Sequence, residues 1–321
     1  MTIISDICRR SREAHSALRP QVKHTPFDRS YSLSAQYGCE LFLKSEHLQH
    51  TGSFKFRGAS NKIRLLSEEQ KNKGVITASS GNHGQGMALA GAIAGVPVVV
   101  YAASTASPLK LEAIRTYGAK VVTLDKDPLQ VELDAGQAAN AKGVAYVSPY
   151  NDLDIIAGQG TVAFEMLEEQ AELDAVFVAV GGGGLISGIG AVLKTHSPDT
   201  RVIGCWPAAS VAMYASLKAG EIVESEEHET LSDGTAGGLE PGTITFPVCQ
   251  QVIDESVLVS EEEIKNAIQV IARYERQMVE GAAGVAMAAF IQQADKWKGK
   301  RVAIVICGRN ITLEKFAQVI S

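Results

Sequence analysis

The stretch AVFVAVGGGGLISGIGAVL occupies residues 175–193 and decides the fold. Its first six residues are apolar and β-branched, which predicts a buried strand, and residues 185–193 carry a helical pattern. Between them lie four consecutive glycines, Gly181, Gly182, Gly183 and Gly184. Without side chains, backbone amides can converge on one ligand, and at a helix N-terminus they favour an anion. The run therefore predicts a phosphate site, with a tight strand-to-helix turn as the alternative.

Strand and helix signals alternate along the rest of the chain. Short apolar strands are expected at residues 41–44, 74–78, 98–102, 120–124, 201–206 and 301–307, and helices at 83–94 and 109–117. Apolar strands separated by helices indicate parallel sheets covered on both faces, so the predicted class is α/β. Residues 225–247 lack periodicity and are expected to form a long loop, either functional or merely a mobile surface segment.

Composition limits what the protein can bind. The chain has 321 residues, enough for about two domains, with a net charge of −6 and no basic block, so nucleic acid is not an expected partner. Its five cysteines are widely spaced, which favours a reducing compartment, the cytoplasm, over a disulfide or zinc framework. The polar N-terminus predicts no signal peptide, and the lack of an apolar run of ~20 residues predicts no membrane span.

The sequence SFKFRG, residues 53–58, places Lys55 between two phenylalanines and beside Arg57. Burial and a neighbouring cation would both lower the pKa of this lysine. An amine with a lowered pKa is a nucleophile that can form a Schiff base. An exposed lysine at the start of a helix is the other interpretation.

A second motif, SSGNHGQG at residues 79–86, follows a predicted strand and opens a predicted helix. Its hydroxyls, amide and free backbone N–H groups suit a substrate carboxylate, although a plain turn with a helix cap is the alternative. The residues expected to bind the substrate are Ser79, Ser80, Gly81, Asn82 and His83. A reactive lysine, a carboxylate site and a phosphate site at the carboxyl ends of strands together indicate pyridoxal phosphate as cofactor and an amino acid as substrate.

These motifs resemble those of the fold-type II pyridoxal-phosphate enzymes, in particular the threonine and serine dehydratases and the serine racemases. The resemblance covers essentially the whole chain and is carried by SFKFRGA (53–59), SSGNHGQG (79–86), IAGQGT (156–161), GGGGL (181–185), DGTAGG (233–238) and CGRN (307–310). It implies a tryptophan synthase β-like fold of two open, twisted, mainly parallel sheets covered by helices. It also implies a large domain of residues 1–73 and 151–321, a small mobile domain of residues 74–150, and a homodimer.

The resemblance also implies roles for single residues. Lys55 resembles the Schiff-base lysine, and Ser80 a second acid–base group on the opposite face of the substrate Cα. The other residues implied to bind the cofactor are Phe54 on the ring, Asn82 at the ring hydroxyl, Gly181, Gly182, Gly183 and Gly184 at the phosphate, and Gly234, Glu280 and Cys307 near the ring. A neutral thiol at Cys307 would suit β-elimination better than transamination.

Three departures from the family pattern bear on metal and substrate. Trp206 and Ala212 stand where serine racemases have acidic metal ligands, so no structural metal is expected. Arg309 stands where the family usually has glycine, and it could either recognise an anionic or polar substrate group or point to solvent. The loop at residues 237–243 differs from that of threonine dehydratases, and with Arg309 it is similar to the dehydratases of hydroxyectoine utilisation.

The activity implied by the resemblance is that of an ammonia-lyase that converts an L-threonine- or L-serine-type β-hydroxy amino acid into a 2-oxo acid and ammonia. An amino-acid racemase is the second hypothesis, because Ser80 sits where racemases keep a serine. A dehydratase of a hydroxyectoine-derived hydroxy amino acid is a further variant. The third hypothesis, different in class, is a protein that binds the cofactor without catalysis.

Overall fold

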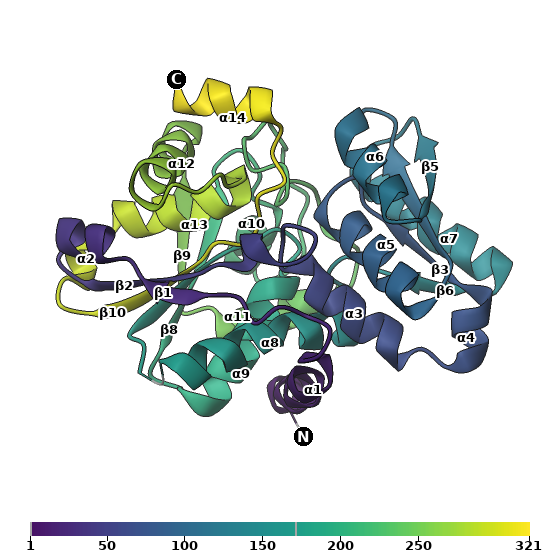
Figure 1. Cartoon of the computed structure of the whole chain (residues 1–321), viewed down its shortest axis with the longest axis horizontal. Coiled ribbons are helices and arrows are strands. Elements are labelled where there is room, and N and C mark those ends of the chain that lie inside the picture. The colour runs from purple at the N-terminus through teal and green to yellow at the C-terminus, as the bar shows by residue number, and fades with distance from the viewer. Residues whose placement is uncertain (1, 171) are drawn as a thin grey trace.

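The computed structural model describes residues 2–170 and 172–321, which form two sheets covered by helices (Figure 1). The strands are β1 (Phe27–Arg29), β2 (Glu40–Lys44), β3 (Val75–Ala78), β4 (Val98–Ala103), β5 (Lys120–Leu124), β6 (Ala145–Val147), β7 (Ala175–Ala179), β8 (Arg201–Pro207), β9 (Glu255–Val259) and β10 (Arg301–Val305). The α-helices are α1 (Ile3–Leu18), α2 (Tyr31–Tyr37), α3 (Lys55–Leu65), α4 (Glu68–Lys73), α5 (Asn82–Ala94), α6 (Pro108–Thr116), α7 (Pro128–Lys142), α8 (Leu153–Glu169), α9 (Gly184–His196), α10 (Ala212–Ala219), α11 (Thr245–Val252), α12 (Glu261–Glu275), α13 (Gly281–Gln292) and α14 (Leu313–Ile320).

The larger sheet has six strands in the order β1-β2-β10-β7-β8-β9. Strands from both ends of the chain meet in it, since β2 pairs in parallel with β10, with Leu41 opposite Val302. Only β1 runs antiparallel, at the edge beside β2. The smaller sheet is parallel throughout, in the order β5-β4-β3-β6, and all its strands come from residues 75–147.

Helix α3 lies between the two sheets (Figure 1). It packs against α5, which covers the smaller sheet, and against α8. The α3–α8 contact is close because two glycines face each other there: a Cβ on Gly158 would lie 2.5 Å from the Cα of Gly58. The residue that begins α3 is therefore held between the two halves of the molecule.

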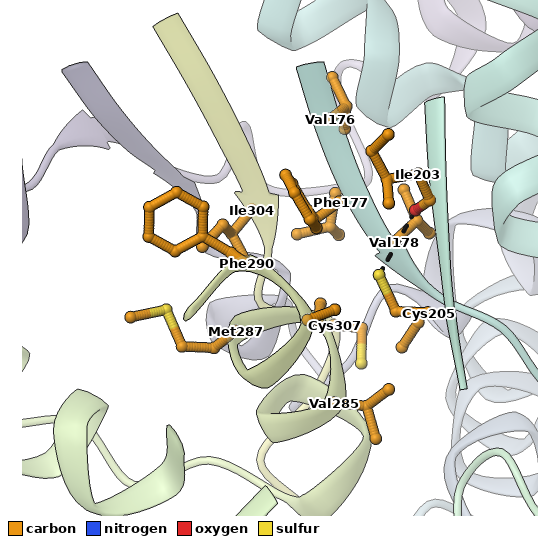
Figure 2. Packing of buried hydrophobic residues seen from close by; sticks show 14 of the residues in the cluster. Val176, Phe177, Val178, Ile203, Cys205, Val285, Met287, Phe290, Ile304 and Cys307 are labelled. Atoms are coloured by element: carbon orange, nitrogen blue, oxygen red, sulfur yellow. Dashed lines mark hydrogen bonds between the residues drawn. The ribbon is translucent and has the colours of Figure 1, made fainter. Parts of the chain in front are cut away.

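The hydrophobic core of the larger sheet surrounds its central strands. Every residue of β7 is buried, and Phe177 packs edge-on against Phe290 of α13, with ring centroids 5.8 Å apart. Figure 2 shows Phe177 and Ile304 of neighbouring strands beside Phe290, with Cys307 just beyond β10 in the same core. Burying a side chain of this size stabilises the fold by about 1.5–3 kcal/mol.

The structure confirms the predicted α/β class and the two mainly parallel sheets covered by helices. Each expected strand is present within one or two residues of its predicted limits. Three strands were not predicted: β1 and β6 have only three residues each, and β9 is a partly exposed edge strand. The predicted loop at residues 225–247 ends early, because α11 begins at Thr245.

Candidate active site

Lys55 is the first residue of α3 and is partly buried, so the interpretation as an exposed surface lysine is wrong. Its Nζ donates to the backbone oxygen of Pro149 at 2.8 Å and lies 5.3 Å from the centroid of the Phe54 ring. Burial lowers the pKa of Lys55 to about 8, although interactions with Glu132, Cys307 and Glu280 oppose the shift. At pH 7 roughly a tenth of this amine is therefore unprotonated, far more than for a lysine with the ordinary pKa.

The expected effect of Arg57 on Lys55 is corrected by the structure. Arg57 is completely buried and binds two carboxylates, with Nε 2.7 Å from Glu46 Oε2 and Nη1 2.6 Å from Glu165 Oε1. The low pKa of Lys55 comes from burial, and Arg57 makes no contribution to it. Arg57 instead fixes α3 to α8, which carries Glu165.

The segment after β10 lies directly against the segment before Lys55. Phe54 N donates to Cys307 O at 3.1 Å, and Arg309 N donates to Gly52 O at 2.9 Å. This pairing places the side chain of Cys307 beside Lys55. Burial raises the pKa of the Cys307 thiol well above its usual range, so the thiol is neutral.

Several of the predicted site residues contact the carboxyl group of Glu280. Oε1 accepts from Asn82 Nδ2 at 2.8 Å, and Oε2 accepts from Asn310 N at 2.8 Å. Gly234 lies against the same group, since a Cβ there would be 3.4 Å from Glu280 Oε1. Burial, and next the charge of Asp233, raise the pKa of Glu280 to about 7. Asn82, Gly234, Glu280 and the end of β10 thus meet although they are far apart in sequence.

The loop from Ser79 to His83 joins β3 to α5. Gly81 is the N-cap of α5 and provides no side-chain acceptor, so the amides at the start of this helix are not capped by a side chain. Ser79 Oγ accepts from Gly81 N at 3.1 Å, and Ser80 remains partly exposed. This geometry favours a carboxylate-binding loop over a plain turn with a side-chain cap.

His83 is 2% exposed, and neither of its ring nitrogens has a hydrogen-bond partner among the described residues. Burial, and next the charge of Lys55, lower its pKa well below the usual range, so the ring is neutral. A buried polar group without a partner is costly, which makes His83 a candidate to contact a bound molecule.

The glycine run connects β7 to α9. Gly183 has φ +85°, a left-handed conformation that favours glycine. A Cβ on Gly182 would lie 2.4 Å from the Tyr150 ring, and one on Gly181 would lie 2.9 Å from the Thr235 backbone. The turn therefore accepts no side chains at these positions. Its amides stand at the N-terminus of α9, as an anion-binding turn requires.

Four further polar residues were not predicted: Glu132, which acts on the pKa of Lys55, and Tyr146, Tyr150 and Glu240, which interact with Glu132. Glu240 lies in the loop before α11 and is held by Ser148 Oγ at 2.6 Å and Asn151 Nδ2 at 2.7 Å. A signal for Glu132 was present, because it lies three residues before the buried Ala135 on the apolar face of α7. A carboxylate on such a face is costly to bury unless another group pairs with it.

The structure shows where two of the residues that depart from the family pattern lie. The Arg309 side chain is exposed and lies over Gly52, where a Cβ would be 3.2 Å from its Cγ, so it packs on the surface. Trp206 is 1% exposed, and its ring packs against Gly204 and Tyr214. In residues 2–170 and 172–321, no group of three His, Cys, Asp or Glu side chains could hold a metal ion.

A family model described as "Pyridoxal-phosphate dependent enzyme" matches residues 18–308. The chain belongs to this family. The match confirms the predicted resemblance and the predicted cofactor, pyridoxal phosphate.

Two relatives match nearly the whole chain. The L-threonine ammonia-lyase of Thermotoga maritima is 41% identical over 311 residues, which are 97% of this chain and 77% of that one. The catabolic L-threonine dehydratase TdcB of Staphylococcus aureus is 38% identical over 312 residues, 96% of this chain and 90% of that one.

Solved structures of this family have the same fold. The processed form of tomato (Solanum lycopersicum) threonine deaminase isoform 2 superposes with a TM-score of 0.91 at 33% identity, covering 98% of this chain and 93% of that one. Maize serine racemase superposes with a TM-score of 0.90 at 32% identity, covering 97% and 95%. Since the relatives that match almost the whole of this chain are named as ammonia-lyases or dehydratases, the hypothesis of a non-catalytic binding protein is not supported.

The residues present fit pyridoxal phosphate. The cofactor needs an amine that can be unprotonated near neutral pH, and Lys55 provides one. It also needs a site for its phosphate, and the glycine run at the start of α9 leaves its amides free of side chains. The ring of His83 is buried without a hydrogen-bond partner of good geometry among the described residues, so it is a further polar group available to a bound molecule.

Proposed function

We propose that this protein is an ammonia-lyase that converts an L-threonine- or L-serine-type β-hydroxy amino acid into a 2-oxo acid and ammonia. The observation that carries the proposal is the low-pKa amine of Lys55, set beside the neutral thiol of Cys307, in a chain 41% identical to an L-threonine ammonia-lyase. In the reaction the Cα–H and Cβ–O bonds break and water leaves. Water then hydrolyses the released enamine to the 2-oxo acid and ammonia, so atoms balance.

Each predicted residue has a role in this proposal. Lys55 Nζ holds the cofactor and takes the proton from Cα of the substrate. The remaining cofactor contacts come from Phe54, Asn82, Gly181, Gly182, Gly183, Gly184, Gly234, Glu280 and Cys307. The loop of Ser79, Ser80, Gly81, Asn82 and His83 binds the substrate carboxylate and orients Cα toward Lys55. When bound, pyridoxal phosphate supplies an electron sink for the charge left at Cα.

A panel of β-hydroxy amino acids tests the proposed activity. Purified protein with cofactor is incubated with the L- and D-forms of threonine and serine, and 2-oxo acid, ammonia and chirality are measured. Release of 2-oxo acid from an L-substrate supports the proposal. Inversion of chirality without ammonia would favour the racemase, which the likeness to maize serine racemase keeps as the second candidate.

Exchange of Gly183 for aspartate is expected to weaken cofactor binding at least about tenfold, as measured by titration of cofactor absorbance. The new side chain adds a negative charge beside the phosphate and strains a backbone with φ +85°. Gly220→Asp is the matched control, because Gly220 has φ +80° and nothing within 4 Å of its Cβ position. Equal affinity in the two variants would place the phosphate elsewhere.

Ser80→Ala is expected to leave elimination of an L-substrate within about tenfold of wild type while removing any racemisation or turnover of a D-substrate. The reason is that Ser80 is proposed to face Cα opposite Lys55, so each residue serves one face. Chiral chromatography of the remaining amino acid gives the readout. The two-face assignment fails if Ser80→Ala stops L-substrate elimination as completely as loss of Lys55 does.

Chelation of divalent ions is expected to change neither activity nor melting temperature. An indole at position 206 and a methyl group at position 212 cannot ligate a hard cation. Both quantities are measured before and after exhaustive dialysis against EDTA. A large loss that added Mg²⁺ or Ca²⁺ restores would contradict this expectation.

We also propose the arrangement in which the enzyme works. Residues 1–73 and 151–321 form the large domain, residues 74–150 form a small domain that moves, and two copies form a homodimer in the cytoplasm. All strands of the smaller sheet come from residues 75–147, which supports this division. Among the described residues, no helix is long and apolar enough to cross a membrane. Light scattering after gel filtration tests the dimer.

A further inference from the structure

The side chain of Gln159 reaches from α8 to the backbone of α3 close to Lys55. It is 1% exposed, and its Oε1 accepts from Gly58 N at 3.2 Å. Lys55 is the first residue of α3, so Gly58 lies within the first turn of the same helix. Gln159 belongs to IAGQGT, residues 156–161, a motif that none of the proposed cofactor and substrate contacts uses.

The start of α3 has no side-chain cap. Its N-cap is Phe54, which has no side-chain oxygen, and Ser53 Oγ just before it is buried without a partner among the described residues. In a regular first turn the Phe54 oxygen accepts from Gly58 N, but here it accepts from Arg57 N at 3.0 Å. Gln159 Oε1 provides the acceptor for Gly58 N, as a capping side chain does at other helices.

Close packing holds these groups in place. A Cβ on Gly58 would lie 2.4 Å from Gln159 Nε2 and 2.8 Å from Ile155 O, so the Gln159 amide lies directly on the backbone of α3. Helix α5 also touches this turn, since a Cβ on Gly86 would lie 3.1 Å from the carbonyl carbon of Lys55. The first turn is therefore held by α8 and α5, and a shift of its backbone would move Lys55.

Three of the links between α3 and α8 differ in what they fix. Lys62 pairs with Asp154 at 3.0 Å, and Arg57 pairs with Glu165 at 2.6 Å. Both of these join one side chain to another, with several rotatable bonds between the two backbones. Gln159 instead bonds to the main chain of α3, so it fixes the backbone of the helix itself.

We propose that Gln159 is a positioning residue: by accepting from Gly58 N it fixes the first turn of α3, and so sets where Lys55 Nζ meets the cofactor and the substrate. The inference rests on the proposed role of Lys55. When the Schiff base forms, Nζ bonds to the aldehyde carbon of the cofactor, and the aldehyde oxygen leaves as water. A displacement of about 1 Å is enough to slow a step of this kind about 10²-fold.

Three variants separate positioning from simple packing. Gln159→Met keeps the length of the side chain and removes the acceptor, whereas Gln159→Glu keeps an acceptor oxygen. Asn61→Leu is the matched control, because Asn61 Nδ2 donates to Asp154 O at 2.7 Å and joins the same two helices. Asn61 is about 9 Å along α3 from Lys55, so its loss is expected to lower the melting temperature without changing the first turn.

Hydrogen exchange, followed by mass spectrometry of the holoenzyme, measures the hydrogen bond itself. The Gly58 amide is expected to exchange at least about tenfold faster in Gln159→Met than in wild type, because it loses its acceptor. In Gln159→Glu and Asn61→Leu its exchange should stay close to the wild-type rate. Equal exchange at Gly58 in Gln159→Met and wild type would overturn the proposal.

The rate at which cofactor-free protein captures added pyridoxal phosphate reports the position of Lys55 without any substrate. At saturating cofactor, the absorbance change of capture is expected to be about tenfold to 10²-fold slower in Gln159→Met, and close to wild type in Gln159→Glu and Asn61→Leu. Equal slowing in Gln159→Met and Asn61→Leu would show that Gln159 only packs, and would overturn the proposal. If Gln159→Glu does not fold, the comparison of these two variants decides alone.

Neither of these measurements needs turnover, so this inference and the proposed function can fail separately. Slow capture in Gln159→Met, with a wild-type protein inactive on L-threonine and L-serine, would support the positioning role and contradict the lyase. Release of 2-oxo acid from L-threonine with equal kcat in wild type and Gln159→Met would support the lyase and contradict the positioning role. A lower kcat with an unchanged KM in Gln159→Met, restored in Gln159→Glu, supports both.

Discussion

Lys55→Ala is expected to reduce turnover by about 10⁴-fold or more, because one amine both holds the cofactor and moves the Cα proton. The purified variant should also lose the near-visible absorbance of the bound cofactor. Lys71→Ala is the control, since Lys71 lies on α4 and, among the residues that the structure describes, pairs only with the exposed Glu68, at 2.8 Å. It should keep wild-type turnover and absorbance.

Borohydride reduction followed by peptide mass spectrometry independently tests whether Lys55 is the lysine that holds the cofactor. In wild-type protein, the added mass of the cofactor is expected on the peptide that contains Lys55, and on no other lysine. A cofactor found on a different lysine would refute the assignment. So would a Lys55→Ala protein that retains a substantial part of the wild-type rate.

Arg57→Met is expected to lower the free energy of unfolding by about 3–5 kcal/mol, the usual effect of breaking a buried ion cluster. Arg57 and Lys44 are both completely buried and share the carboxylate of Glu165, while Glu46 binds Arg57 from the other side. The two cations balance the two anions, so removing one leaves a buried negative charge. Equilibrium unfolding in urea measures the loss.

Arg301→Met, a change on the protein surface, is the stability control for Arg57→Met. Arg301 pairs with Glu172 at 2.7 Å, and both side chains are well exposed, so Arg301→Met should change stability little. If Arg57→Met does not yield folded protein, Lys44→Met tests the same cluster through its second cation. Unfolding free energies equal to that of wild type in both buried variants would show that the cluster does not stabilise the fold.

Local patterns were enough to place single motifs on the strands and helices that carry them. The glycine run could be placed at the start of a helix because strand and helix patterns flank it directly. Lys55 could be selected because the aromatic residues beside it indicate burial. The strands β1 and β6 were not predicted, because three residues are too few for a pattern and their pairing depends on partners distant in sequence.

Other features of the site depend on contacts that no local pattern contains. Arg57 was interpreted as a neighbour that lowers the pKa of Lys55, but its partner Glu165 lies 108 residues away and neutralises it. Glu132 is one polar residue on a mostly apolar helix face, and only the fold brings it near Lys55 and Glu240. The sequence therefore predicted the family and its cofactor, whereas the surroundings of Glu132 depend on contacts between distant parts of the chain.

The stoichiometry of the reaction with L-threonine and L-serine tests the central claim most directly. Purified holoenzyme is incubated with each amino acid, and 2-oxo acid, ammonia and the chirality of the remaining substrate are followed in one time course. The lyase described here predicts 2-oxo acid and ammonia in equal amounts from at least one of them, with the remaining amino acid still in the L-form. Conversion to the D-form without ammonia, or no change in either substrate under conditions where the cofactor is bound, would contradict it.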